Sequence, residues 1–257
     1  MNYCDNFTML LLALDTSTRQ ASIALCTEDD LYAEYTWRSG NNHSVELLTS
    51  IQRLSAECTI PLQQIDAVVV ATGPGSFNGV RVALATAKTL AFALKKPLVG
   101  VSALDCIAAQ QRHWVGPICA VLEAGRSELY AACYVFEKQR KDDGSICYAM
   151  QQLSEYLLLT PLQLVEQLHE QIGASSFLFC GELSAASRQV LYTQMGEQSF
   201  FVSSVEAARS ASTLAMLAQQ RLHRGEVNDP LLLEPLYLRR PSITTSTRKQ
   251  VLLSGPP

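Results

Sequence analysis

One pattern of strands and acidic residues occurs twice in this chain of 257 residues. The first copy is an apolar strand that ends at Asp15 and returns, after a polar turn, as the alternating segment 21–26. The second copy ends its first strand at Glu123 and returns over 128–136. Another strand and then helices alternating with strands follow each copy, which is typical of α/β folds. The sequence therefore predicts a duplicated α/β fold with two subdomains, each built on a mixed sheet.

This layout is shared by ribonuclease-H-like, actin-like and sugar-kinase domains, the group called ASKHA. In those proteins the acidic residue at the end of the first strand helps to hold metal and ATP phosphates in the cleft between subdomains. Asp15, followed by Thr16 and Ser17, occupies that position here. The alternative is purely structural, because an aspartate at a strand end also caps a turn with its carboxylate.

The repeat sets the expected boundaries of the subdomains. We expect an N-terminal actin-like subdomain over 9–112 and a C-terminal subdomain over 113–205. A helix at about 206–224, ended by a glycine, is expected to join the first subdomain. Residues 1–8 and 242–257 are expected to be flexible termini.

A glycine-rich turn follows the buried strand at 66–71, and a segment rich in Ala and Leu over 82–94 predicts a helix after it. The turn lacks the Lys-Ser/Thr pair of a P-loop, and its glycine spacing departs from the dinucleotide fingerprint. Its free N–H groups would still form an anion site at a helix N-terminus. With the first hairpin, the candidate nucleotide-binding residues are Asp15, Thr16, Ser17, Gly73, Gly75 and Ser76.

Two predicted helices carry distinctive faces. The helix that begins at Ser44 has an apolar stripe typical of an amphipathic helix. In the helix after the glycine turn, small residues fall four apart and form a smooth face: Gly79, Ala83, Ala87 and Ala91. Such a face suits close packing inside the protein or between subunits, and its composition does not decide between the two.

Composition narrows the functional classes. A net charge of −4 gives no support for direct binding of nucleic acid. No apolar run approaches the roughly 20 residues of a membrane span, and the N-terminus lacks a signal-peptide pattern. The eight cysteines include no Cys-x-x-Cys pair and the four histidines no helical metal pair, so no metal site is expected. These features predict a cytoplasmic protein with free thiols.

The chain resembles the TsaB (YeaZ) family over about residues 9–241. The resemblance rests on the first hairpin and the glycine turn, supported by shorter motifs in the same order. These motifs are 14–18, His43-Ser44 with its helix, 73–81, 123–130 and 235–239. Two positions depart from the family pattern, since Asn78 stands where Thr is usual and Glu123 where Asp is usual.

The resemblance implies a role in forming N6-threonylcarbamoyladenosine at position 37 of tRNAs that read codons beginning with A. It implies a non-catalytic scaffold or activator, a pseudoenzyme that binds and organises the catalytic paralogue TsaD together with the ATPase TsaE. It further implies indirect contact with tRNA through the complex, a homodimer when the protein is alone, and no cofactor beyond weak binding of ATP or ADP.

The resemblance also implies where partners bind. In the family, the helices here at about 44–58 and 79–95 form the bundle that meets TsaD or a second copy of TsaB. The interface residues expected on this basis are Leu47, Leu48, Ile51, Leu54, Gly79, Val80, Ala83, Leu84, Ala87 and Ala91.

Two other functions compete with the scaffold. An ATP-binding or ATP-hydrolysing enzyme of the actin and sugar-kinase superfamily would use the first hairpin and the glycine turn as its phosphate site. A metallopeptidase is suggested by the glycoprotease label attached to related sequences. The absence of metal-ligand spacing disfavours the peptidase.

Overall fold

The computed structural model describes residues 8–40, 43–140, 144, 146–173 and 176–239. Apart from residue 8, the termini expected to be flexible, 1–8 and 242–257, lie outside these ranges. Within the described ranges, no helix is both long and apolar enough to cross a membrane.

The first sheet combines an antiparallel meander with two parallel strands. Its order is β3-β2-β1-β4-β5, with β4 parallel to both β1 and β5. The strands are β1 (Leu11–Asp15), β2 (Gln20–Cys26), β3 (Leu31–Arg38), β4 (Ala67–Ala71) and β5 (Leu98–Val101). Every residue of β1 and β4 is buried, because helices cover both faces of the sheet, and central strands of this kind are continuously apolar.

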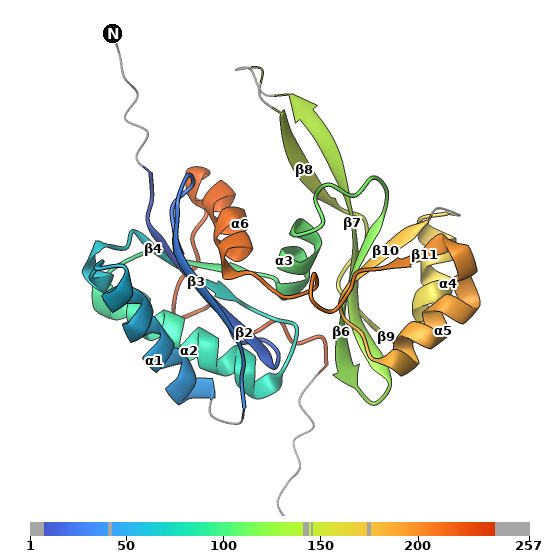
Figure 1. The fold of residues 1–257 in the computed structure, drawn as a ribbon, viewed down its shortest axis with the longest axis horizontal. Coiled ribbons are helices and arrows are strands. Elements are labelled where there is room, and N and C mark those ends of the chain that lie inside the picture. The colour runs from blue at the N-terminus through green and yellow to red at the C-terminus, as the bar shows by residue number, and fades with distance from the viewer. Residues whose placement is uncertain (1–7, 41–42, 141–143, 145, 174–175, 240–257) are drawn as a thin grey trace, which may run out of the picture.

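The second sheet repeats this arrangement. Its order is β11-β10-β6-β7-β8, with β9 paired beside β7. The strands are β6 (Ile118–Gly125), β7 (Glu128–Arg140), β8 (Ile146–Gln152), β9 (Leu157–Leu159), β10 (Phe177–Glu182) and β11 (Ser199–Phe201). Three antiparallel strands followed by two parallel ones in both halves confirm the predicted duplicated, ribonuclease-H-like α/β fold with mixed sheets. Figure 1 shows the two halves side by side, with the hairpin of β7 and β8 projecting beyond the body as an arm.

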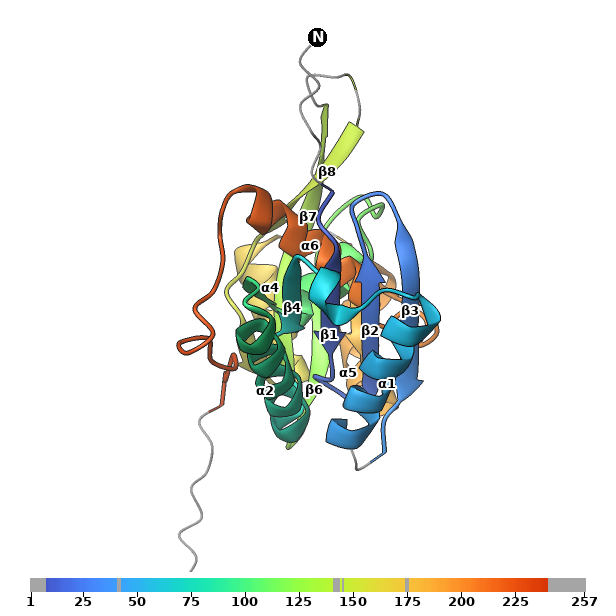
Figure 2. The same ribbon diagram turned by 90° about the vertical axis from the view of Figure 1, so that its left-hand side faces the viewer.

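Six α-helices are described, with two short 3-10 turns at Leu62–Gln64 and Gly196–Gln198. They are α1 (His43–Glu57), α2 (Phe77–Leu94), α3 (Ala103–Ala109), α4 (Pro161–Gln171), α5 (Ala185–Met195) and α6 (Ala211–His223). Helices α1 and α2 cover one face of the first sheet (Figure 2), and α6 covers the other. Helices α4 and α5 pack on the outer face of the second sheet, and α3 packs on its inner face.

Two helix positions bear on the expected subdomain boundaries. The expected boundary at residue 112 puts α3 with the first sheet, whereas most of its apolar face packs on β6, β7 and β10. Helix α6 begins at Ala211, after the expected start near 206, because the Ser210 side chain caps it by accepting a hydrogen bond from Thr213 N. The division at 112 stays a prediction.

The small-residue face of α2 points into the protein. Nine of the ten expected interface residues are buried, and all of these except Gly79 belong to the core between α1, α2 and the first sheet. These nine are Leu47, Ile51, Leu54, Gly79, Val80, Ala83, Leu84, Ala87 and Ala91. In a single chain these residues stabilise the core, and their assignment to a subunit interface stays a prediction. Only Leu48, which is 52% exposed, lies on the outer face.

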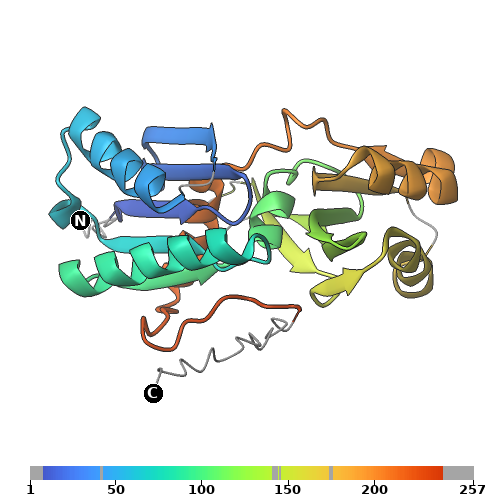
Figure 3. The same cartoon turned by 90° about the horizontal axis from the view of Figure 1, so that it is seen from below.

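A strap, residues 225–239, runs from the end of α6 back across both halves (Figure 3). It is held to the first sheet where Asn228 bridges Leu98 and where Leu236 N donates to Thr72 O at 2.8 Å. At its far end Arg239 forms an ion pair with Glu128 on β7. The strap therefore ties the first sheet to the second.

Candidate functional site

The first hairpin and the glycine turn are pressed against each other. Thr16 Oγ1 donates to Gly79 O at 2.7 Å, and Ser76 N donates to Ser17 O at 2.6 Å. A Cβ atom at Gly75 would lie 2.0 Å from Ser17 O, and one at Gly79 would lie 2.0 Å from Thr16 O. The two glycines are therefore required so that two backbones can touch.

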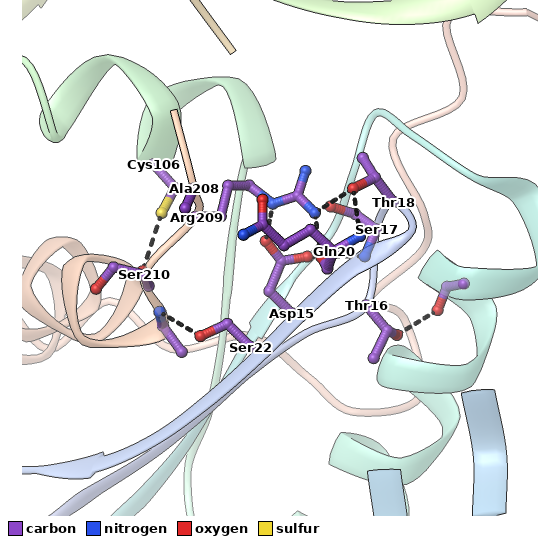
Figure 4. Close-up of polar contacts among 12 residues, drawn as sticks. Asp15, Thr16, Ser17, Thr18, Gln20, Ser22, Cys106, Ala208, Arg209 and Ser210 are labelled. Carbon is purple, nitrogen blue, oxygen red and sulfur yellow. Dashed lines mark hydrogen bonds and ion pairs between the residues drawn. The ribbon is translucent and has the colours of Figure 1, made fainter. Parts of the chain in front are cut away.

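The hairpin carboxylate is buried and already paired. Asp15 is 1% exposed, and its Oδ1 accepts a hydrogen bond from Ser17 N at 2.7 Å. Its Oδ2 lies 2.8 Å from Nε of Arg209, whose side chain is also 1% exposed (Figure 4). A buried carboxylate needs such a partner because an uncompensated charge away from water is costly.

Arg209 contacts both halves of the protein. Its Nη2 donates to Thr18 Oγ1 and to Gln20 O on the first hairpin, and its Nη1 lies 3.5 Å from Glu182 Oε1 at the end of β10. Thr18 also donates to Glu182, which closes the network across the two sheets. Arg209 thus supplies a fixed positive charge beside the carboxylate that, in an actin-like ATPase, faces metal and phosphate.

Sequence reasoning missed Arg209. It stands in a segment of small and polar residues before α6, far along the chain from Asp15, and no local periodicity marks it. The sequence carries no local signal for this role, because only burial, which for an arginine almost always requires a partner, marks the residue.

The structure brings the six candidate nucleotide-binding residues together, yet most of them do not face open space. Asp15, Thr16, Ser17 and Gly73 are buried. Only Gly75 and Ser76 line the adjacent cleft cavity, of about 510 Å³, with residues of both hairpins and the strap. Nucleotide binding at this place stays a prediction.

The second acidic position differs from the first. Strand β6 continues past Glu123 to Gly125, and Glu123 Oε1 accepts a hydrogen bond from Ser184 N at 2.8 Å, just before α5. Glu123 therefore makes a contact within the second half of the fold, whereas Asp15 is part of the network that connects the two halves.

The described ranges also contain cysteines and other side chains of the types that bind metals. Six cysteines there are free, and burial, with a smaller effect of Glu34, raises the pKa of the Cys26 thiol to about 11. Such a thiol is protonated near neutral pH and is a poor nucleophile. No group of three or more His, Cys, Asp or Glu side chains among the described residues is placed to hold a metal ion.

Two facing copies of a ribonuclease-H-like sheet, with an acidic hairpin between them, define an actin-like protein. The family model described as TsaD, tRNA N6-adenosine threonylcarbamoyltransferase, matches residues 38–247. The chain is 31% identical to the tRNA threonylcarbamoyladenosine biosynthesis protein TsaB of Bacillus subtilis (strain 168), over 90% of this chain and 94% of that protein. The chain belongs to the TsaB (YeaZ) family.

Further relatives agree with this assignment. The TsaB protein of Haemophilus influenzae is 30% identical, with 90% of this chain and 94% of that protein covered. The solved structure of YeaZ from Pseudomonas aeruginosa is 28% identical and superposes with a TM-score of 0.69, covering 90% of this chain and all of the other. Membership therefore spans both halves of the fold.

Proposed function

We propose that this protein is a non-catalytic subunit in the biosynthesis of threonylcarbamoyladenosine on tRNA. It binds and organises the catalytic paralogue TsaD, together with the ATPase TsaE, and contacts tRNA through that complex in the cytoplasm. Membership of the TsaB family supports the pathway. The pairing of Asp15 with Arg209 is the observation that carries the non-catalytic role, because it occupies the carboxylate that would otherwise handle metal and phosphate.

The outer face of α1 and α2 is the surface that we propose for TsaD, or for a second copy when the protein is alone. The inner faces of these helices form the core, so only their outer residues can reach a partner. Val45 is 66% exposed, Leu48 52% and Phe92 80%. Exposed apolar side chains of this size on two neighbouring helices are typical of an interaction surface.

Leu48→Arg tests this surface. We expect the variant to remain folded, since Leu48 is outside the core, and to bind TsaD at least tenfold more weakly because a charge is desolvated at the contact. Its homodimer should dissociate in the same way. Size-exclusion chromatography and co-purification with TsaD measure both effects.

Val205→Arg is the matched control, because Val205 is 82% exposed but lies between β11 and α6, away from α1 and α2. This control should keep wild-type assembly. Wild-type assembly by Leu48→Arg as well would show that the outer face of these helices is not the contact surface.

The competing enzyme hypothesis makes a different prediction. The cleft cavity beside Gly75 and Ser76 favours it, because it offers room for a ligand next to the first hairpin. We expect the isolated protein not to turn over ATP, since Asp15 is neutralised by Arg209. A phosphate-release assay measures this, and robust turnover that disappears in Asp15→Asn would replace the scaffold with an ATPase.

A further inference from the structure

A second cavity, of about 800 Å³, lies away from the hairpin contact. It is lined by residues of α6, α3, the arm and the strap, so both halves of the fold contribute to its wall. Its volume falls in the range of small-molecule sites, which are mainly apolar with a few convergent polar groups. The proposed scaffold role makes no use of it.

Asp105, on α3, provides a buried acceptor in this wall. The hydroxyls of Tyr134 and Tyr156 both donate to its Oδ1, at 2.7 and 2.8 Å. Burial raises the pKa of the Asp105 carboxyl, and these two hydrogen bonds oppose part of the rise. Because both tyrosines use one oxygen, Oδ2 is left to accept a hydrogen bond from a ligand.

Three arginines line the same cavity: Arg112 in the turn after α3, Arg221 in α6 and Arg224 directly after α6. Arg221 donates to Gly100 O, and both Arg221 and Arg224 form ion pairs with Glu226, at 3.4 and 2.7 Å. Among the described residues, Arg112 has neither an ion pair nor a hydrogen bond. A half-buried guanidinium that has no partner among the described residues is suited to a planar or phosphate anion.

Aromatic and thioether side chains make up much of the remaining wall. Phe136, Tyr148 and Met150 come from the arm, and Met216 comes from α6. Flat aromatic faces and adaptable methionines provide a good environment for a planar ring. The cavity thus combines a cationic group that can bind an anion, a site for a planar ring and a hydrogen-bond acceptor.

We propose that this cavity binds a small aromatic anion that carries an amino group, of the nucleoside monophosphate class. The anionic group binds at Arg112, the ring lies between the arm and α6, and the amino group donates to Asp105. This site is separate from the hairpin candidates Asp15, Thr16 and Ser17. It does not depend on the proposed scaffold role.

Calorimetric titration of the full chain with adenosine 5′-monophosphate tests the site. We expect binding that weakens at least tenfold in Arg112→Ala and in Tyr148→Ala. Arg188→Ala is the matched control, because this exposed arginine on α5 stacks on Phe201 outside the cavity, and it should bind as the wild type does. Adenosine and inorganic phosphate, titrated separately, should each bind at least tenfold more weakly than the monophosphate.

Arg19→Ala separates this site from the cleft cavity, which Arg19 lines. We expect no change in affinity for the monophosphate in this variant. Absence of binding by the wild type would overturn the proposal. So would loss of binding in Arg19→Ala with normal binding in Arg112→Ala, or adenosine binding as tightly as its monophosphate.

Discussion

Replacing Arg209 with alanine is expected to lower the free energy of unfolding by about 3–5 kcal/mol, the usual cost of breaking a buried ion pair by removing one partner. The variant leaves the Asp15 carboxylate buried without its cation, and it removes the contacts to Thr18 and Glu182 that join the halves. Chemical denaturation at neutral pH measures the change. Arg188→Ala, which removes only an exposed contact with Phe201, should lower it by no more than about 1 kcal/mol.

A second substitution distinguishes the lost charge pair from lost packing. Asp15→Asn removes the orphaned charge and keeps an oxygen that can accept the hydrogen bond from Ser17 N. In the Arg209→Ala protein, Asp15→Asn should therefore raise the free energy of unfolding by about 0.5–3 kcal/mol, which is the usual coupling energy between residues in contact. If Asp15→Asn instead destabilises the wild type and the Arg209→Ala protein equally, the two side chains are not coupled. In that case the proposal that Arg209 neutralises the Asp15 carboxylate is wrong.

Gly79→Ala is expected to destabilise the protein by about 1–3 kcal/mol, the cost typical of overpacking. This change in stability is opposite in direction to the usual effect, because replacing glycine by alanine within a helix normally stabilises a protein by about 1 kcal/mol. The new Cβ would lie 2.0 Å from Thr16 O, so α2 and the first hairpin would have to separate. Thermal or chemical denaturation reports the difference.

Ala85→Gly is the control within the same helix. Ala85 is exposed, so the change should cost about 1 kcal/mol through helix propensity alone. A stabilised Gly79→Ala protein would mean that the hairpin and the glycine turn are not in tight contact.

The sequence predicted the fold well because each half is encoded by local patterns. Apolar strands, the polar turns after Asp15 and before 128–136, and the periodicity of the helices all depend on neighbours along the chain. The motifs of the first hairpin and the glycine turn also led to the correct family.

The site was predicted less well because it depends on contacts between distant residues. A stripe of small residues such as Ala83 and Ala87 fits a sheet as well as a partner helix, and only burial shows that it packs inside. Arg209 meets Asp15 through the return of the chain from the second sheet to α6, which no local pattern indicates. The path of the strap is likewise set by tertiary contacts, such as that of Leu236 with Thr72.

Reconstituted formation of threonylcarbamoyladenosine on tRNA, with purified TsaD and TsaE, ATP and a threonylcarbamoyl donor, tests the central claim most directly. The wild-type protein should support modification, and Leu48→Arg should reduce it at least tenfold because the subunit no longer binds TsaD. Ser17→Ala should keep full activity, since the buried Ser17 hydroxyl has no hydrogen-bond partner among the described residues and the hairpin is proposed to be silent. Full activity of Leu48→Arg together with loss of activity in a folded Ser17→Ala protein would contradict the scaffold role and indicate chemistry at the hairpin.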